Sequence, residues 1–422
     1  MSIFHKSVFD DVFHIWRQEF AQMFRDEGVI IFFFVVPLVY PLLYSWIYNN
    51  ETVRDVPVAV VDDSHTSSSR RFIRKCDASP DVRVAYYAQD IDEARSLVSR
   101  QLVKGIYHIP SDFDTRINRL EQATVSVYCD MSLMLAYKAI FQTAQLVSMD
   151  MGADVKSRLA THYTAHEAQI AARPLAYDDV PLFNPQGGYG SFVLPAVLML
   201  ILQQTLVLGI GLAAGTAREE NRYGQLVPIS MHYHGVFNIV LGKALAYFMV
   251  YAVMGAWLTA AVPRLFHFPQ LATWQSLLAI LTPYILASIF FGMVVSCLVR
   301  YRENVMLLMV FISVPLLFLT GVSWPQSNIP GFWQGISWLF PSTFGVRAYV
   351  RLNSMGATLY DVITEYRVLW IHVLAYFLMA CIVYRYQIFM ARQGAIDHLD
   401  ALKNEEPMEV KSEELQKVKS EE

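Results

Sequence analysis

Residues 29–48 read VIIFFFVVPLVYPLLYSWIY, and this stretch decides the fold because it contains no charged residue. A helix needs about 20 mostly apolar residues to cross the roughly 30 Å hydrocarbon core of a bilayer. The stretch therefore predicts a membrane span. The residues before it include Asp10, Asp11 and Glu19, whereas a cleaved signal peptide has a short basic leader. We therefore expect the span to be retained as an anchor.

Further apolar segments of span length follow later in the chain, and together with the first they predict six spans. The predicted spans are residues 29–48, 191–214, 237–262, 276–299, 305–322 and 368–390. The apolar stretch 329–344 is shorter and is interrupted by glycine and proline. It is more typical of re-entrant or interfacial helices than of a full span.

The composition supports a membrane protein. Hydrophobic residues make up 55% of the 422 residues and charged residues only 17%, whereas soluble domains average about a quarter charged. The net charge of −4 gives no indication of a nucleic-acid surface, so we expect no nucleic-acid partner.

Lysine and arginine near the span ends predict the topology, because cytoplasmic loops carry an excess of both. Placing both termini inside puts most of these residues on the cytoplasmic side, namely Lys6, Arg17, Arg25, Arg218, Arg222, Arg300, Arg302 and Arg392. The outside segments then hold Arg264, Arg347, Arg351 and Arg367. We expect a multi-pass protein of the bacterial inner membrane with both termini in the cytoplasm.

Residues 49–190 differ in character and predict an extracytoplasmic α/β domain inserted after the first span. Apolar runs at 56–61, 82–87, 105–109 and 125–128 are typical of strands. Helical patterns alternate with them at 67–76, 90–103 and 132–172, with Asp90 as the expected cap of the second. The predicted fold is an all-α membrane bundle of six transmembrane helices with this α/β insertion.

We find no catalytic or metal-binding set in the inserted domain. Asp62 and Asp63 follow a strand directly and are typical of an Asx turn. His162 and His166 lie one helical turn apart but lack a third ligand nearby. Cys76 and Cys129 both fall in this domain, and the sequence leaves open whether they form a disulfide.

The order of these parts resembles the type-2 ABC (ATP-binding cassette) transporter permeases, in particular the exporters with a large extracytoplasmic domain after the first span. The resemblance rests on Arg25-Asp26 before the first span and on several short motifs. These are VPVAVVDDS at 56–64, GIYHIP at 105–110, FNP at 183–185, FVLP at 192–195, GVSWP at 321–325, IP at 329–330 and FPST at 340–343. It implies re-entrant helices near residues 325–350, marked by Gly321, Pro325, Pro330 and Pro341.

The same resemblance implies an ATPase-docking loop between the second and third spans. Family members often carry Glu, Arg and Glu before Gly-Thr there, whereas this chain has Gln225 in place of the threonine. The candidate docking residues are Arg218, Glu219, Glu220, Asn221, Arg222, Tyr223, Gly224 and Leu226. Their mixed charges, together with one aromatic and one aliphatic residue, suit a protein contact.

The chain has no G-x-x-x-x-G-K-[ST] loop, so it is not expected to bind or hydrolyse ATP itself. No cofactor is expected in this chain. The resemblance implies that ATP and Mg are bound by a separate ABC ATPase subunit and that a second permease copy or a paralogue completes the transporter. A periplasmic adaptor and membrane lipid are further expected partners.

None of the predicted spans contains Asp or Glu, whereas ion-coupled transporters usually keep carboxylates at mid-membrane. An apolar or amphipathic substrate is expected. Gln203 and Gln204, midway along the second span, predict either a helix contact or part of a polar path.

The two ends of the chain are expected to lie outside the bilayer core. Residues 1–28 predict an amphipathic interfacial helix, with Phe9, Phe13 and Phe20 on its apolar face. Residues 391–422 form a charged tail for which we expect no fixed structure.

Two functions remain open. The first is the membrane permease of an ABC exporter. The second is a membrane-anchored receptor or assembly protein whose external domain binds a partner without transport. A membrane-embedded hydrolase lacks a nucleophile–base pair or a metal set.

Overall fold

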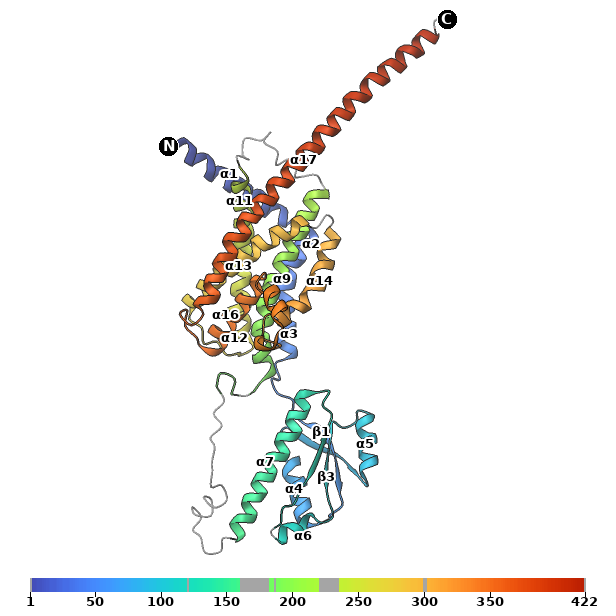
Figure 1. Ribbon diagram of the computed structural model, residues 1–422, viewed down its shortest axis with the longest axis vertical. Coiled ribbons are helices and arrows are strands. Elements are labelled where there is room, and N and C mark those ends of the chain that lie inside the picture. The colour runs from blue at the N-terminus through green and yellow to red at the C-terminus, as the bar shows by residue number, and fades with distance from the viewer. Residues whose placement is uncertain are drawn as a thin grey trace. The chain divides into compact units, whose positions relative to one another are not determined.

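A computed structural model describes residues 2–119, 121–159, 182–185, 187–219, 235–298 and 302–420. The chain divides into a membrane unit, residues 1–49 and 182–422, and an inserted unit, residues 50–181. Figure 1 shows the helical membrane unit and the mixed α/β architecture of the inserted unit.

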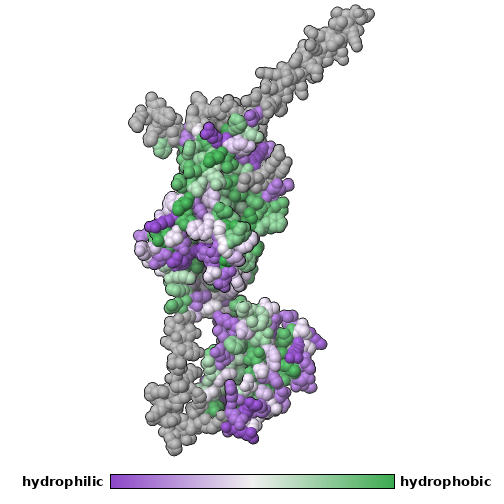
Figure 2. Space-filling view, in the orientation of Figure 1, coloured by the Kyte–Doolittle hydropathy of each residue, from purple (hydrophilic) through white to green (hydrophobic). Residues whose placement is uncertain are grey.

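The membrane unit contains the predicted spans. Six helices among the described residues are long and apolar enough to cross a membrane. Four of them are single helices or part of one: α9 Tyr189–Glu219, α13 Trp274–Leu298, α14 Arg302–Leu319 and the first part of α17 Ile363–Ser420. The other two each contain a π-helix. The first span, Glu27–Ile47, consists of α2 Glu27–Ile30, the π-helix η1 Ile31–Val35 and α3 Val36–Ile47, and the third, Val236–Leu265, consists of α11 Val236–Ala256, the π-helix η2 Trp257–Ala261 and α12 Val262–Leu265. Figure 2 shows apolar residues gathered on the visible face of this unit, between its two ends.

Helix α9 lies at the centre of the membrane unit. Its apolar window is 78% buried, against 28% for the first span and 22% for α14. Glycines let the neighbouring helices approach closely. A Cβ at Gly209 would lie 2.0 Å from the ring of Phe33, and one at Gly211 would lie 2.3 Å from Val305. Small residues at helix contacts are the usual means of close packing in membranes.

Helix α1 (Ser2–Met23) confirms the predicted N-terminal helix, but its buried face was not foreseen. Asp11, Ile15, Glu19 and Met23 are buried, and α1 packs along α11. Phe9 and Phe13, on the predicted apolar face, are 70% and 59% exposed. That this face lies on a membrane stays a prediction.

From the sequence we expect no fixed structure for residues 391–422. This is wrong for the backbone, because α17 continues as a helix to Ser420. The segment is rich in Glu and Lys, which have high helix propensity, and this outweighs the missing core pattern.

The inserted unit confirms the predicted α/β alternation. Its four-stranded sheet has the order β2-β1-β3-β4, with β1 (Val56–Asp62) parallel to β2 (Val82–Ala88) and β3 (Gly105–Ile109), and β4 (Ser126–Cys129) antiparallel to β3. Helices α4 (Ser67–Asp77) and α7 (Met134–Leu159) cover one face and α5 (Ile91–Ser99) the other (Figure 1). A short helix, α6 (Phe113–Asn118), precedes β4.

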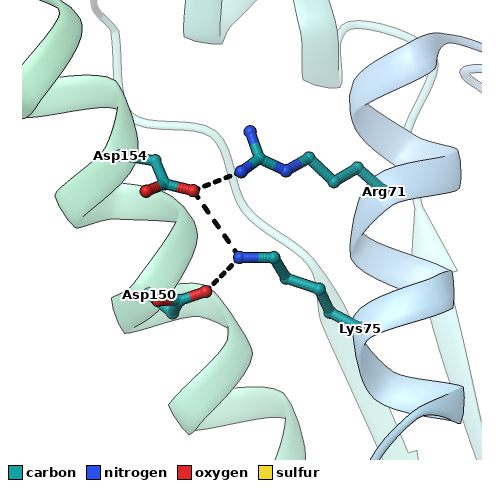
Figure 3. A network of polar contacts seen from close by, with 4 residues as sticks. All are labelled: Arg71, Lys75, Asp150 and Asp154. Carbon is teal, nitrogen blue, oxygen red and sulfur yellow. Dashed lines mark hydrogen bonds and ion pairs between the residues drawn. The ribbon is translucent and has the colours of Figure 1, made fainter.

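Alternating residues of β1 supply both cores of the inserted unit. Val58 and Val60 pack with Phe72 and Ile140 on one face, whereas Ala59 packs with the α5 side on the other. This follows from the two-residue period of a strand. Ion pairs add to the α4–α7 contact: Arg71 pairs with Asp154, and Lys75 with Asp150 and, at 3.5 Å, with Asp154 (Figure 3).

Helix α5 starts as predicted but ends earlier than the expected residue 103. Asp90 caps it by accepting a hydrogen bond of 2.7 Å from the amide of Glu93. Gln101 then adopts φ +60°, and the amide of Leu102 bonds back to the carbonyl of Leu97. This is a Schellman ending on a residue other than glycine, which a sequence pattern does not reveal.

Three smaller expectations also meet the structure. Asp62 makes the predicted turn, since its Oδ1 atom accepts from the amides of Ser64 and His65, each at 3.1 Å. Cys76 and Cys129 are free cysteines, so no disulfide joins them. His162, His166 and the predicted helix beyond residue 159 lie outside the described residues.

Candidate functional site

We call the end of the membrane unit that carries α1 and the far part of α17 the terminal end. The opposite end is the insert end, where the chain leaves for residues 50–181 and returns. Tyr48 and Tyr189 mark the insert end, and their ring centroids lie 5.6 Å apart. The predicted docking loop begins at the terminal end, at the close of α9.

Asp26 is the centre of a polar cluster at the terminal end. It caps the first span, because its Oδ1 atom accepts hydrogen bonds from the amides of Gly28 (2.9 Å) and Val29 (3.3 Å). Its Oδ2 atom accepts a hydrogen bond of 2.5 Å from the hydroxyl of Thr216 in α9. The guanidinium of Arg302 in α14 lies 3.7 Å from Oδ1. One carboxylate therefore joins the first, second and fifth spans.

Arg218 fixes the first residues of the predicted docking loop. Its Nη2 atom donates a hydrogen bond of 3.1 Å to the carbonyl of Cys297, near the end of α13. The side chain of Gln387 in α17 donates to the same carbonyl, at 3.3 Å. A cation near the last carbonyls of a helix is also favoured by the helix dipole. Spans two, four and six thus meet at the base of the loop.

Glu219 is the last residue of α9 and is exposed. The other candidate docking residues, Glu220, Asn221, Arg222, Tyr223, Gly224 and Leu226, lie outside the described residues. Their docking role stays a prediction.

A buried ion pair attaches α1 to the third span. The ammonium of Lys243 lies 2.6 Å from Oε2 of Glu19, and the hydroxyl of Tyr247 donates to Oε1. The side chains of Glu19 and Lys243 are only 8% and 12% exposed. Lys243 therefore pairs inside the protein instead of extending to the membrane surface. The sequence contains one indication that Glu19 is buried, since it lies four residues after Ile15 and so on the same face of the helix.

Gln203 and Gln204 lie where α9 meets α13 and α14. Gln203 is 1% exposed, and Gln204 donates a long hydrogen bond of 3.5 Å to the carbonyl of Ser313. The void beside them has a volume of about 30 Å³, which suits water rather than a substrate. The geometry favours a helix contact; a place in a transport path stays a prediction.

Short helices occupy the segment predicted to be re-entrant. Gly321 turns the chain with φ +84°, and Pro325 precedes the 3-10 turn η3 Gln326–Asn328. Pro330 precedes α15 Gly331–Ser337, and Pro341 begins α16 Pro341–Met355. Helix α16 is largely buried and contacts α9, α13 and α17.

The same segment is tied to the last span by hydrogen bonds. The Nε2 atom of His372 in α17 lies 2.8 Å from the carbonyl of Trp338, and the hydroxyl of Tyr376 donates to the carbonyl of Leu339. That α15 and α16 re-enter the membrane stays a prediction.

The described part of the chain contains no group of three or more His, Cys, Asp or Glu residues that could hold a metal ion. Its chemistry is that of helix contacts and span-end polar clusters. With six helices long and apolar enough to cross a membrane among the described residues, this defines the class as a multi-pass membrane protein.

Residues 28–382 match the model of the ABC-2 family transporter protein, and the chain belongs to this family. It is also similar to the "Probable multidrug ABC transporter permease YbhR" of Escherichia coli strain K12, with 18% identity over 336 residues. That match covers 78% of this chain and 87% of the relative. The protein of the same name from Escherichia coli O157:H7 matches equally. The chain is therefore a transmembrane permease subunit, and its family implies an ABC ATPase partner and typically a permease dimer.

Proposed function

We propose that this permease subunit belongs to an ABC exporter. It moves an apolar or amphipathic substrate out of the cytoplasm or inner leaflet, using ATP that a separate subunit hydrolyses with Mg. The relative's name, a multidrug permease, supports a substrate of this kind. The spans support it too, because their acidic residues lie at the helix ends, at Glu27, Glu219, Glu303 and Glu365.

The observation that carries the proposal is the anchoring of the loop at Arg218. A docking loop transmits force only if its base is held by the spans that must move. Arg218 contacts the ends of α13 and, through the shared carbonyl of Cys297, α17. Thr216, two residues earlier, is held by Asp26 of the first span. A displacement of the loop therefore reaches several spans by direct contact.

A second permease copy or a paralogue is part of the proposal. Helix α14 is the least buried span and exposes Val310 (68%), Phe311 (77%) and Val314 (59%). These residues form an apolar face that suits a second copy or lipid. We place both termini in the cytoplasm of a bacterial inner membrane, with the inserted unit outside.

The alternative function, a receptor whose external domain binds a partner, has one observation in its favour. The inserted unit has a cavity of about 760 Å³ lined by Arg70, Arg74 and Tyr87. It lies at the carboxyl ends of β1 and β2, where open α/β sheets usually bind ligands. An acidic group on a periplasmic adaptor would suit these arginines. This role is compatible with export and does not require it.

Reconstitution separates the two functions. The permease and its ATPase subunit are placed in proteoliposomes with a fluorescent amphipathic dye, and dye movement is followed with and without Mg-ATP. The exporter proposal expects ATP-dependent movement toward the side that bears the inserted unit. Stable complex formation with no ATP-dependent movement of a panel of such dyes would favour the receptor.

A further inference from the structure

A second cavity lies at the insert end of the membrane unit, at the opposite end of the bundle from Arg218 and Glu219, which close α9. Its volume is about 510 Å³. Arg347 and Arg351 of α16 and Glu365 of α17 line its polar wall, and Phe183, Phe192 and Val322 line its apolar wall. Residues from 182–192, 269, 320–326 and 347–365 thus meet around one space.

The charges around this cavity are not balanced. Arg351 pairs with Glu365, with Nη1 and Oε1 3.0 Å apart. The Nε atom of Arg347 donates to the carbonyl of Thr320 at 3.0 Å, which uses one of its donors. Arg347 therefore contributes a positive charge that no carboxylate of the described residues neutralises by a close ion pair.

Two polar atoms of the cluster are also unsatisfied. Nη2 of Arg347 and Oε2 of Glu365 are buried and have no hydrogen-bond partner. A buried charged donor without a partner is unfavourable and marks a place where a water, ion or ligand belongs.

The apolar wall shows what kind of molecule would fit beside the charge. Phe183 and Phe192 are 48% and 51% exposed although they border a cavity with a charged side. A ligand with one anionic group and an apolar chain would satisfy both walls. Guanidinium groups bind phosphate and carboxylate in a two-pronged geometry that ammonium groups cannot match.

We propose that this cavity binds an anionic amphiphile, whose phosphate or carboxylate group pairs with Arg347 and whose chain lies along Phe183, Phe192 and Val322. The site lies within one permease copy and shares no residue with the docking loop. It therefore goes beyond ATP-driven export and can fail while the exporter function holds.

The test measures binding to the purified full-length permease, stripped of lipid, by native mass spectrometry. The probes are dioleoyl phosphatidylglycerol, dioleoylglycerol with the same chains but no phosphate, and inorganic phosphate with no chains. The proposal expects phosphatidylglycerol to bind about tenfold or more tightly than either fragment, because it alone engages both walls. Equal binding of phosphatidylglycerol and dioleoylglycerol, or of phosphatidylglycerol and inorganic phosphate, would overturn it.

Variants locate the site. Arg347→Gln is expected to lower phosphatidylglycerol affinity to that of dioleoylglycerol, whereas Arg264→Gln, an exposed arginine stacked on Trp274 at the same end, leaves it unchanged. Ser354→Phe fills the cavity without removing a charge and is expected to weaken binding by a similar factor. Thermal melting confirms that each variant is folded. If folded Ser354→Phe binds like the parent, the ligand is elsewhere and the proposal is wrong.

Lipid extraction then distinguishes two sources of the amphiphile, and either result supports the site. Phospholipid retained by freshly purified protein, and lost in Arg347→Gln, indicates a resident lipid of the bilayer. No retained phospholipid, with intact binding of added phosphatidylglycerol, indicates a molecule that arrives during transport.

Discussion

The hydroxyl of Thr216 donates a hydrogen bond of 2.5 Å to the carboxylate of Asp26. These residues end the second span and begin the first, 190 positions apart in the chain. Together with Arg302, they form one polar cluster that joins three spans at the terminal end of the bundle. The docking loop starts immediately after it.

Replacing Asp26 should loosen this contact. Asp26→Ala removes the helix cap and the partner of Thr216, so we expect a loss of stability of about 1–2 kcal/mol, typical of a lost cap. We expect coupling to suffer more than stability, with ATP hydrolysis continuing while transport falls. Thermal melting and transport per ATP are the measurements. Asp92→Ala, on an ion pair of exposed residues in the inserted unit, is the matched control and should change neither.

The Glu19–Lys243 pair makes a double-mutant prediction. Among the described contacts, Lys243→Met leaves the buried Glu19 carboxylate with the hydroxyl of Tyr247 and no cation, which should cost about 3–5 kcal/mol. Adding Glu19→Leu removes the unpaired charge, so the double variant should recover most of that loss. Chemical unfolding in detergent measures each variant. Losses that simply add would show that the two residues do not interact.

Gly209 tests the close packing of α9 against the first span. Gly209→Leu places side-chain atoms where the Phe33 ring already lies, and we expect destabilisation of about 1–3 kcal/mol. Phe33→Ala in the same chain should relieve part of it. Gly152→Ala is the control, since its Cβ would meet nothing within 4 Å, and replacing a helical glycine there should be neutral or stabilising. A Gly209→Leu variant as stable as the parent would show that the helices do not approach this closely.

The free cysteines of the inserted unit make a pH-dependent prediction. Burial raises the pKa of the Cys76 thiol to about 12 and that of Cys129 to about 11. Because the folded state favours the protonated thiol, each thiol stabilises the folded protein fully at any pH below the pKa that the thiol has in the unfolded chain. It is lost as pH rises from about 8.5, the usual value, toward 12.

Alkylation tests the burial of the Cys76 thiol directly. At pH 8, N-ethylmaleimide should modify Cys76 only after denaturation, because the thiol is fully buried as well as protonated. Rapid modification of Cys76 in the folded protein would contradict the structure. A mass that rises on reduction by that of two hydrogen atoms would instead indicate a disulfide between Cys76 and Cys129.

The membrane spans were predictable because each is a long apolar run, and the strands of the inserted unit because they are short and bounded by turn residues. Val56–Asp62 and Gly105–Ile109 fall where their composition places them. The early end of α5 was not predictable, because it depends on a non-glycine residue with positive φ at Gln101.

Polar partners that lie far apart in the chain could not be predicted from the sequence. Glu19 and Lys243 are 224 residues apart, and nothing in either local pattern indicates the other. Arg218 could be assigned to a loop, but its bond to the carbonyl of Cys297 depends on how two helix ends meet. The acid–base pattern of residues 218–226 predicts a contact with a partner, and only a partner can test it.

The most direct test of the central claim is therefore a pull-down of the ATPase subunit by the tagged permease, quantified with ATP hydrolysis in the eluate. Glu219, Glu220 and Arg222 are reversed in charge together, and Glu121 and Arg119 of the inserted unit are reversed as the control. The exporter account predicts that the first variant loses the ATPase while the control retains it. A loop variant that still binds the ATPase and supports ATP-dependent transport at the parent's level would contradict the account.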